Sequence, residues 1–469
     1  MAVYRCSVCD TEYDEEKEGV TWDQVSNDWA CHVCESGKPM FRPVDDGRSS
    51  SDSPAAVTGP ATGQPEVFEK TFDDFETYMA DIHTMAETGE SIIEPMRTRK
   101  PTFSWDDILI KGAQLANIPL NLDHPVNTRT TIGPGARQPL VVETPIYITH
   151  MSFGALSKEA KLALARGSAA VKTAMCSGEG GILPESQHSS YKYIFEYVPN
   201  RYSVNEENLK QVDAIEIKFG QSAKPGMGGH LPGNKVTQEI AAIRGFEEGA
   251  DIISPAHFDD IKTREDLKKK IQWLRVASEG KPIGIKFAAG HIEADLEVAL
   301  FAEPDFITID GRAGATGASP KFIKAAASIP TLFAQYRARK YLDERGGDRV
   351  SLVITGGLRV SADFAKALAL GADAVAIGTT ALIAIGCRQY RICNTGKCPM
   401  GITTQDPELR ARLDVNASAG RLENFLRVST EEIKDFARLT GNDDVHKLSI
   451  QDLCTTNSEI SNHTEIEHV

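Results

Sequence analysis

The chain has 469 residues, which is enough for two or three ordinary domains or for one large α/β barrel with additions. Its net charge of −15 argues against a general nucleic-acid or membrane-surface binder, because both need a positive face to meet phosphates. The N-terminus, MAVYRCSVCD, lacks the pattern of a secretory signal, and no later apolar stretch is long enough to span a bilayer. We therefore expect a cytoplasmic protein, in which closely spaced cysteines are metal ligands rather than disulfides.

Residues 1–42 contain two Cys-x-x-Cys pairs, Cys6 with Cys9 and Cys31 with Cys34. Each pair turns the chain so that both sulfurs face inward, and two pairs can present four thiolates tetrahedrally to one metal ion. The sequence therefore predicts an N-terminal domain that holds iron or zinc.

Aromatic residues accompany the two pairs in YRCSVCDTEYD and DWACHVCESGKPMF. These stretches resemble rubredoxin, with Tyr4, Tyr13, Trp29 and Phe41 at the positions of the aromatic core of that family. The resemblance implies one redox-active mononuclear iron, with zinc as the alternative. An acidic residue follows each pair where rubredoxins usually have glycine, so the potential or the metal can differ.

Two segments connect this domain to the rest of the chain. Residues 43–66 are rich in Ser, Pro, Gly and Ala, which is typical of a linker. Residues 67–102 include the acidic, amphipathic run FEKTFDDFETYMADIHTMAETG, which predicts helices that pack on the following domain.

Residues 103–410 repeat one pattern: a short apolar run, a glycine-rich turn and a longer Ala/Leu/Lys/Glu segment, as in LVITGGLRVSADFAKALALGADAVAIGTTAL. This alternation predicts βα units around a parallel sheet, and the length is close to that of a (β/α)8 TIM barrel with an insertion. Residues 411–469 predict a C-terminal helical extension. In it, STEEIKDFARLTG predicts a helix that begins with a capping box at Ser429 or Thr430 and ends at Gly441.

Two glycine turns follow the runs expected to form the last two barrel strands. Gly356 and Gly357 lie in ITGGLR, and Gly378 and Thr379 lie in AIGTTAL. Their backbone N–H groups can approach a phosphate, and a helix N-terminus adds partial positive charge. The alternative is that these glycines only serve turns that need a positive φ.

Three cysteines, Cys387, Cys393 and Cys398, occupy twelve positions directly after the second turn. Three thiols at this spacing predict a metal or cluster site, and a structural zinc that lacks its fourth ligand is the alternative. A helix from Thr379 to Gly386 would place Cys387 about a dozen ångströms beyond the phosphate loop.

From about Pro145 to Arg410 the chain resembles the FMN-binding synthase domain of glutamate synthase. The matching stretches are MSFGALS, SGEGG, FGQSAKPGMGGHLPG, GATGASP, TGGL, IGTTALIAIGC and the cysteine cluster. The resemblance implies a three-iron, four-sulfide cluster on Cys387, Cys393 and Cys398. It also implies that FMN is bound by Met151, Ser152, Ser177, Lys286, Gly317, Gly356, Gly357, Gly378 and Thr379.

The same resemblance implies reductive amination of 2-oxoglutarate with ammonium to give glutamate. Lys224 would hold a substrate carboxylate, Glu179 and Gln221 would complete the catalytic group, and Lys286 would approach the N1/O2 edge of the flavin. Departures include Ile182 and Met227, which stand where the family usually has glutamate, and SPAHFDDI, which lacks its usual paired histidines.

Residue 2 is Ala2 rather than the nucleophilic cysteine of a glutaminase domain, and no glycine-rich β-helix follows the barrel. We therefore expect an oligomer that uses free ammonium or works with separate amidotransferase and β-helix subunits, and an electron donor protein or reductase. Two alternatives stay open: methylamine as donor, as in N-methylglutamate synthase, and an electron-transfer flavoprotein subunit that acts on another substrate.

Overall fold

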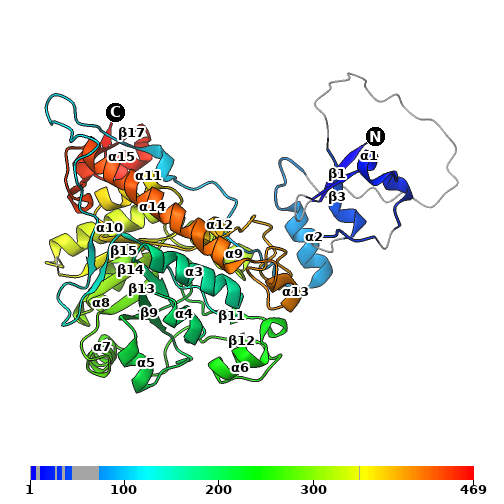
Figure 1. Cartoon of the computed structure of the whole chain (residues 1–469), viewed down its shortest axis with the longest axis horizontal. Helices are drawn as coiled ribbons and strands as arrows, with labels where there is room; N and C mark the ends of the chain where they lie inside the picture. Colours follow the sequence, from blue (N-terminus) through cyan, green and yellow to red (C-terminus); the bar gives the residue numbers. More distant parts are fainter. Residues whose placement is uncertain (1, 7–10, 27–28, 34–36, 45–72, 348) are drawn as a thin grey trace. The chain divides into compact units, whose positions relative to one another are not determined.

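The structure analysed is a computed structural model that describes residues 2–6, 11–26, 29–33, 37–44, 73–347 and 349–469. The chain divides into two compact units, Met1–Ile93 and Glu94–Val469 (Figure 1), and each is described by itself. The domain limits expected from the sequence at 42, 66, 102 and 410 stay predictions.

Short, fully apolar runs of the second unit form eight parallel strands that close into a barrel. They are β7 (Ile146–Ile148), β8 (Ala174–Cys176), β9 (Lys192–Tyr197), β10 (Ala214–Lys218), β13 (Ile283–Ala288), β14 (Phe306–Asp310), β15 (Ser351–Thr355) and β16 (Ala374–Ile377). Strands adjacent in this series are paired, and β16 pairs with β7 to complete the ring. The predicted TIM barrel is confirmed, with the two glycine turns after its seventh and eighth strands.

Helices follow the strands around the barrel (Figure 1). They are α3 (Lys158–Ala170), α4 (Pro184–His188), α5 (Glu206–Gln211), α7 (Arg264–Ala277), α8 (Ile292–Phe301), α9 (Lys321–Ala326) with α10 (Thr331–Glu344), α11 (Ser361–Ala369) and α12 (Thr379–Ala384). Side-chain caps begin several of them; Thr263 and Asp266, for example, form a capping box at α7. An insertion between β10 and α7 contains β11 (His230–Leu231), α6 (Gln238–Arg244) and β12 (Ile252–Ile253).

A hairpin closes the end of the barrel at which the strands begin. It consists of β5 (Thr130–Ile132) and β6 (Leu140–Val142). Its buried side chains form one apolar cluster with the first residues of several strands, among them Ala174, Ala214 and Phe306. This end is therefore filled, and the opposite end, where the strands finish, is left for a site.

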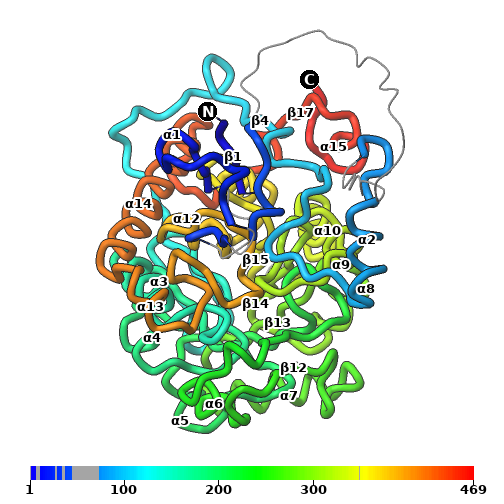
Figure 2. Tube along the Cα trace, turned by 90° about the vertical axis from the view of Figure 1, so that its right-hand side faces the viewer, coloured from blue at the N-terminus to red at the C-terminus, as the bar shows by residue number. Residues whose placement is uncertain are grey.

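The helix α14 (Val415–Leu439) lies beside α3 in both ribbon views (Figures 1 and 2). It begins fourteen residues before Ser429, so the predicted start at Ser429 or Thr430 is wrong. Asp414 is the actual cap and accepts a hydrogen bond from the Ala417 N–H, whereas the Thr430 hydroxyl donates to the Leu426 carbonyl within the helix. The predicted end is close, because Gly441 follows the last turn with φ of 85°.

The C-terminal residues also form strands that the sequence did not predict. β17 (Leu453–Thr455) lies between β18 (Glu467–His468) and β4 (Ile108–Ile110). The helix α15 (Ser458–His463) and 3-10 helices at Val445–Lys447 and Ile450–Asp452 lie in this part of the chain, and α13 (Pro407–Arg410) comes just before it. Two other 3-10 helices of the second unit lie at Trp105–Asp107 and Gly233–Lys235. The extension is therefore not purely helical.

The first unit is built around aromatic rings. The sheet order is β2 (Glu12–Asp14), β1 (Val3–Cys6) and β3 (Phe41–Pro43), with α1 (Glu15–Glu18), α2 (Met79–Thr88) and 3-10 helices at Trp22–Gln24 and Lys38–Met40. The four aromatic residues named from the sequence gather around Trp22, whose ring lies 4.8 Å from Tyr4 and 5.1 Å from Phe41. Cys6 and Cys31 are buried, and Cys9 and Cys34 lie outside the described residues.

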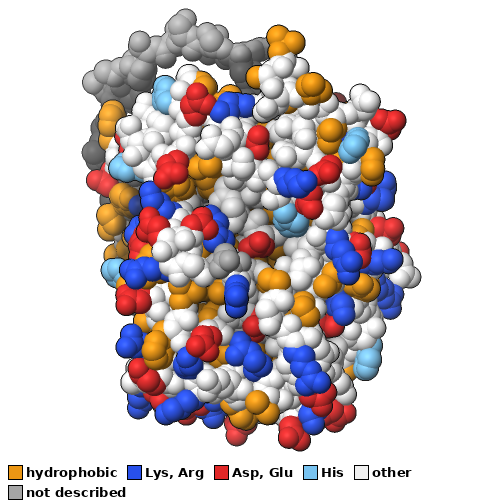
Figure 3. Space-filling view, turned by 90° about the vertical axis from the view of Figure 1, so that its left-hand side faces the viewer, with side chains coloured by type: hydrophobic (Ala, Val, Ile, Leu, Met, Phe, Trp, Pro, Cys, Tyr) orange, Lys and Arg blue, Asp and Glu red, His pale blue; other side chains and the backbone are white. Residues whose placement is uncertain are grey.

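Within the described residues, no helix combines the length and apolar character needed to cross a membrane. On the face drawn in Figure 3, basic and acidic side chains are interspersed.

The two-unit division predicts the result of a truncation. Removal of residues 1–60 should leave the barrel unit folded, because its core consists of residues after Glu94. We expect a cooperative thermal transition within a few degrees of the highest transition of the full chain, measured by calorimetry. An insoluble product, or loss of that transition, would show that the first unit is needed for the fold of the second.

Candidate functional site

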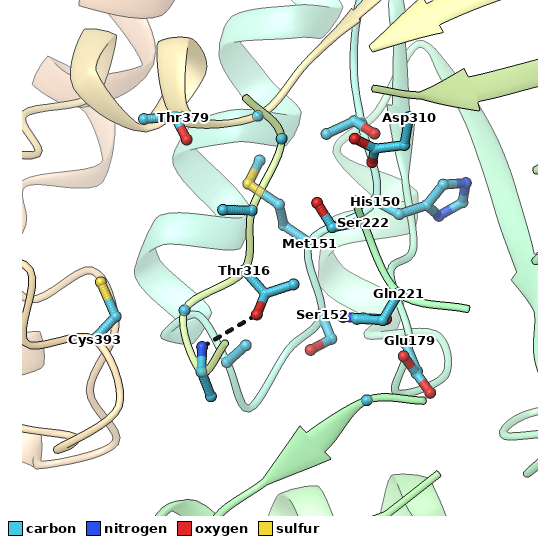
Figure 4. Close-up of a pocket in the computed structure, with 18 of the residues that line it drawn as sticks. His150, Met151, Ser152, Glu179, Gln221, Ser222, Asp310, Thr316, Thr379 and Cys393 are labelled. Atoms are coloured by element: carbon cyan, nitrogen blue, oxygen red, sulfur yellow. Dashed lines mark hydrogen bonds between the residues drawn. The ribbon is translucent and has the colours of Figure 1, made fainter. Parts of the chain in front are cut away.

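The carboxyl ends of the barrel strands surround a cavity with an empty volume of about 1500 Å³, part of which is open solvent. All but one of the predicted catalytic and flavin-binding residues line it, together with one of the predicted cysteines: Met151, Ser152, Glu179, Gln221, Lys224, Lys286, Gly317, Gly356, Gly357, Gly378, Thr379 and Cys393. Figure 4 shows Met151 and Thr316 in the middle, with Thr379 and Cys393 on one side and Glu179, Gln221 and Asp310 on the other. Thr379, the first residue of α12, thus lies across the cavity from Glu179 and Gln221.

Ser177 is the exception, because it is fully buried and does not line the cavity. Its hydroxyl accepts a hydrogen bond of 2.9 Å from the Glu196 N–H and joins the ends of β8 and β9. The structure therefore gives Ser177 a supporting position.

The glycine turn after β15 requires glycine for steric reasons. Gly356 has φ of 112° and Gly357 has φ of 93°, and a Cβ on Gly356 would lie 2.4 Å from the Gly311 carbonyl oxygen. Gly378 caps α12, whose first N–H groups have no partner within the helix. The positive φ angles and the close backbone contacts are enough to explain why Gly356 and Gly357 are glycines. They do not by themselves indicate that the turn binds an anion, so a further observation is needed.

That observation is a pair of neighbouring arginines next to the turns, with Asp363 as the one carboxylate that acts on the pKa of Arg359. Arg359 lines the cavity, and burial together with the nearby Arg97 guanidinium lowers its pKa to about 10. Among the described residues, neither arginine forms an ion pair with a carboxylate. An anionic group in this end of the cavity would relieve the repulsion between them.

Lys286 lies on β13, as predicted, and its side chain is part of the cavity lining. Its Nζ lies 3.3 Å from the Thr149 hydroxyl, to which it donates, and 3.8 Å from Asp310 Oδ2. Burial acts to lower the pKa of Lys286, but Asp310 and Glu216 outweigh burial and raise it. Lys286 therefore carries its charge at neutral pH.

Lys224 lies on the loop after β10 and is 3% exposed. In the described part of the chain its Nζ donates only to the Gly228 carbonyl, at 3.3 Å, and forms no ion pair. Burial lowers its pKa to about 8, against the opposing effect of Glu179. A buried ammonium group with one long hydrogen bond is poised to bind an anionic ligand.

Glu179 pairs with Lys218, a residue that the sequence reasoning missed. Lys218 Nζ lies 2.6 Å from Glu179 Oε2 and 2.5 Å from Gln221 Oε1. Burial acts to raise the pKa of Glu179, but Lys218 outweighs it and lowers the pKa. The sequence offered a sign of this role, because IEIKFG has the same pattern as IGIKFA, the strand that contains Lys286. In the structure, Lys218 and Lys286 are register partners on β10 and β13.

His150 and Glu196 were also missed. His150 Nδ1 accepts a hydrogen bond from the Gly178 N–H, and its Nε2 lies 3.0 Å from Glu216 Oε2. Glu196 lines the cavity and is 2% exposed; Lys218 Nζ lies 3.5 Å from its Oε2, but neither carboxylate oxygen has a hydrogen-bond partner among the described residues. Asp310 Oδ1 is also buried without a hydrogen-bond partner among the described residues. These acceptors call for N–H or O–H donors from a bound molecule.

Lys161 of α3 holds the strand ends that carry these groups. Its fully buried Nζ donates to the carbonyl oxygens of Met151 at 2.9 Å, Cys176 at 3.0 Å and Ser177 at 2.9 Å. The loops after β7 and β8 are thereby fixed to one ammonium group.

The three clustered cysteines line a second cavity, with an empty volume of about 350 Å³. Cys393 lines both cavities, and a Cβ on Gly317 would lie 3.2 Å from its Cβ. Burial raises the pKa of the Cys393 thiol to about 11, and that of Cys387 is also raised. Thiolates at this site therefore need a cation to stabilise them.

The comparisons with known proteins agree with this geometry. The family model described as "Conserved region in glutamate synthase" matches residues 107–443. The chain therefore belongs to the glutamate synthase family, which confirms the resemblance of the barrel to that family and the prediction of an oxidoreductase of this type. The rubredoxin resemblance of the N-terminal residues stays a prediction.

Two relatives show how far the similarity extends, and one solved structure is compared for its fold alone. A "Glutamate synthase large subunit-like protein" of Rhizobium meliloti is 39% identical over 409 residues, 83% of this chain and 92% of that protein. An "Archaeal glutamate synthase [NADPH]" of Methanocaldococcus jannaschii is 39% identical over 78% of both chains. A solved mandelate oxidase mutant is 16% identical, with a TM-score of 0.48 over 75% of this chain and 88% of that one.

The Lys218–Glu179 pair predicts the effect of removing one partner. Lys218→Met should destabilise the protein by about 3–5 kcal/mol, because it leaves Glu179 buried without its cation. Denaturant unfolding measures the change. The double variant Lys218→Met, Glu179→Gln should recover part of the loss, and equal stability of wild type and Lys218→Met would show that the pair is not formed.

Proposed function

We propose that the chain is an FMN- and iron–sulfur-dependent glutamate synthase that reductively aminates 2-oxoglutarate to glutamate. The observation that carries the proposal is Lys224, a buried cation without a carboxylate partner in a cavity lined by residues of the family motifs. A dicarboxylic keto acid supplies the anion that this lysine lacks.

The residues present fit FMN. The turns at Gly356, Gly357 and Gly378 present backbone without side chains to the cavity, and Arg359 offers charge for a phosphate. Glu196 and Asp310 offer acceptors for ring or ribityl donors, and Lys286 offers a cation. When bound, FMN would supply the hydride that reduces the imine.

The chain's own residues then have distinct tasks around the substrate. Lys224 binds a carboxylate, and Gln221, held by Lys218, orients it. Because its pKa is lowered, Glu179 stays ionised and can accept an N–H from the nitrogen donor but cannot supply a proton. Met151 and Ser152, fixed through Lys161, would face the flavin ring.

The cysteine cavity fits a three-iron, four-sulfide cluster. It presents three sulfurs from a single loop beside the larger cavity, and such a cluster needs three protein ligands. We further infer a mononuclear iron on Cys6, Cys9, Cys31 and Cys34, supported by the aromatic cluster around the buried Cys6 and Cys31. The electron donor, the cytoplasmic location and any partner subunits stay predictions.

Ammonium as the nitrogen donor can be tested against methylamine. The protein is reduced anaerobically and mixed with 2-oxoglutarate and either amine, and flavin reoxidation is followed by absorbance. We expect reoxidation with ammonium and formation of glutamate. Reoxidation with methylamine alone would assign an N-methylglutamate synthase, and reoxidation with neither would reject the proposed function.

Lys224→Ala should lower kcat/KM for 2-oxoglutarate by roughly 30- to 1000-fold, about 2–4 kcal/mol, because a charge-assisted hydrogen bond is lost. Flavin and iron content should not change, since Lys224 lies away from the glycine turns. Wild-type kinetics in this variant would reject the substrate role.

The pKa of Lys224 gives a matching pH dependence. The ammonium form that binds the anion is present below pH 8 and is lost as the pH rises through about 8. The Kd of 2-oxoglutarate for the oxidised protein should therefore rise above pH 8, by up to about tenfold per pH unit. Lys224→Arg keeps its charge, so its Kd should stay flat between pH 7 and 9; the same rise in both proteins would point to another group.

Metal and flavin analysis tests the cofactors. We expect one FMN, acid-labile sulfide and an iron content that matches one mononuclear site and one three-iron cluster. Cys393→Ser should abolish the paramagnetic signal of the cluster, because three ligands leave none in reserve, while FMN is retained. Zinc alone, or an unchanged signal in the variant, would contradict the assignment.

A further inference from the structure

The two cavities share a wall, and part of that wall comes from outside the barrel. Met96, Leu382, Cys393 and Thr403 line both cavities. Met96 belongs to the segment Glu94–Met96, here called the strap, which precedes the first strand of the unit. Met96 has φ of 67°, a left-handed conformation that is strained for a residue with a Cβ. Contacts around the strap must hold it in place.

Those contacts come from the loop between β14 and α9 and from α9 itself. The Glu94 N–H donates to the Ser319 carbonyl and the Met96 N–H to the Thr316 carbonyl, both at 2.9 Å. Figure 4 shows Thr316 in the cavity, with its hydroxyl accepting a hydrogen bond from the Ala318 N–H. The strap is thus paired with a loop that lines the larger cavity.

Lys324 of α9 makes the densest set of bonds to the strap. Its Nζ donates to the carbonyl oxygens of Glu94 at 2.8 Å, Pro95 at 3.3 Å and Met96 at 3.0 Å, and it also pairs with the Glu94 carboxylate. Lys324 is 4% exposed and lines neither cavity, so it can act on them only through the strap.

The cysteine loop is bonded to the residue that follows the strap. Arg391, which lines the second cavity, donates from Nη1 to the Arg97 carbonyl at 3.0 Å. The strap is therefore bonded to the loop after β14, its next residue is bonded to the cysteine loop, and the Met96 side chain is buried in the wall that the two cavities share.

We propose that Lys324 is a positioning residue that holds the Glu94–Met96 strap as a partition between the two cavities, and that this partition keeps solvent out of the space between them. The proposal rests on the proposed function only for the identity of the groups in the cavities. The strap and its hydrogen bonds are formed by residues of this chain and do not depend on which groups occupy the cavities.

Lys324→Met tests the positioning role, with Lys340→Met, an exposed lysine of α10 paired with Glu465, as the charge-matched control. Amide hydrogen exchange of peptides spanning residues 90–100 should be at least about tenfold faster in Lys324→Met and unchanged in the control. Equal exchange in both variants would overturn the positioning role. This measurement needs no cofactor, so it gives a result even if the protein lacks flavin.

Met96→Gly tests the partition separately and serves if Lys324→Met does not fold. Glycine adopts φ of 67° without strain, so the strap should keep its exchange protection while the wall loses a side chain. Quenching of the bound flavin by iodide should become several-fold faster in Met96→Gly and in Lys324→Met than in wild type. Wild-type quenching in Met96→Gly would overturn the partition. Absence of flavin from the wild-type protein would instead reject the proposed function.

Discussion

The mouth of the barrel depends on one buried ammonium group, that of Lys161. Three carbonyl oxygens at the ends of β7 and β8 point at its Nζ, and three N–H donors exist only in the protonated form. Burial works against that form and lowers the pKa of Lys161 to about 7. The loops that carry Met151, Ser152 and Glu179 therefore rely on a charge that the barrel core disfavours, and no carboxylate among the described residues pairs with it.

Much of the barrel could be predicted because each βα unit is encoded locally. The apolar runs before ITGGLR and AIGTTAL are its seventh and eighth strands, and Lys286 lies on a strand as expected. The β4–β17 pairing could not be predicted, since its residues are more than 300 positions apart and neither strand exceeds three residues. The start of α14 was misplaced because Ser429 and Thr430 resemble a cap locally, while packing against α3 continues the helix through them.

The candidate site was predicted best where backbone geometry limits the choice of residue. Gly356 and Gly357 have positive φ, which favours glycine, so the turn can be identified from the sequence. Lys218, His150 and Glu196 were missed because a charged residue in an apolar run does not reveal its partners, which come from other strands. Ser177 lies in a family motif, but its hydroxyl accepts a hydrogen bond from the Glu196 N–H within the protein. The sequence does not distinguish this supporting role from a contact with a cofactor.

The insertion between β10 and α7 is one continuous piece of chain, and it supplies a whole wall of the cavity. Lys224, His230 and Arg244 come from it, whereas the glycine turns come from the loops after β15 and β16. The closed ring of strands supports each loop separately, so this insertion can differ in length or sequence without disturbing the turns after β15 and β16. A change confined to it would reshape the wall around Lys224 and leave Glu179, which follows β8, and the glycine turns in place.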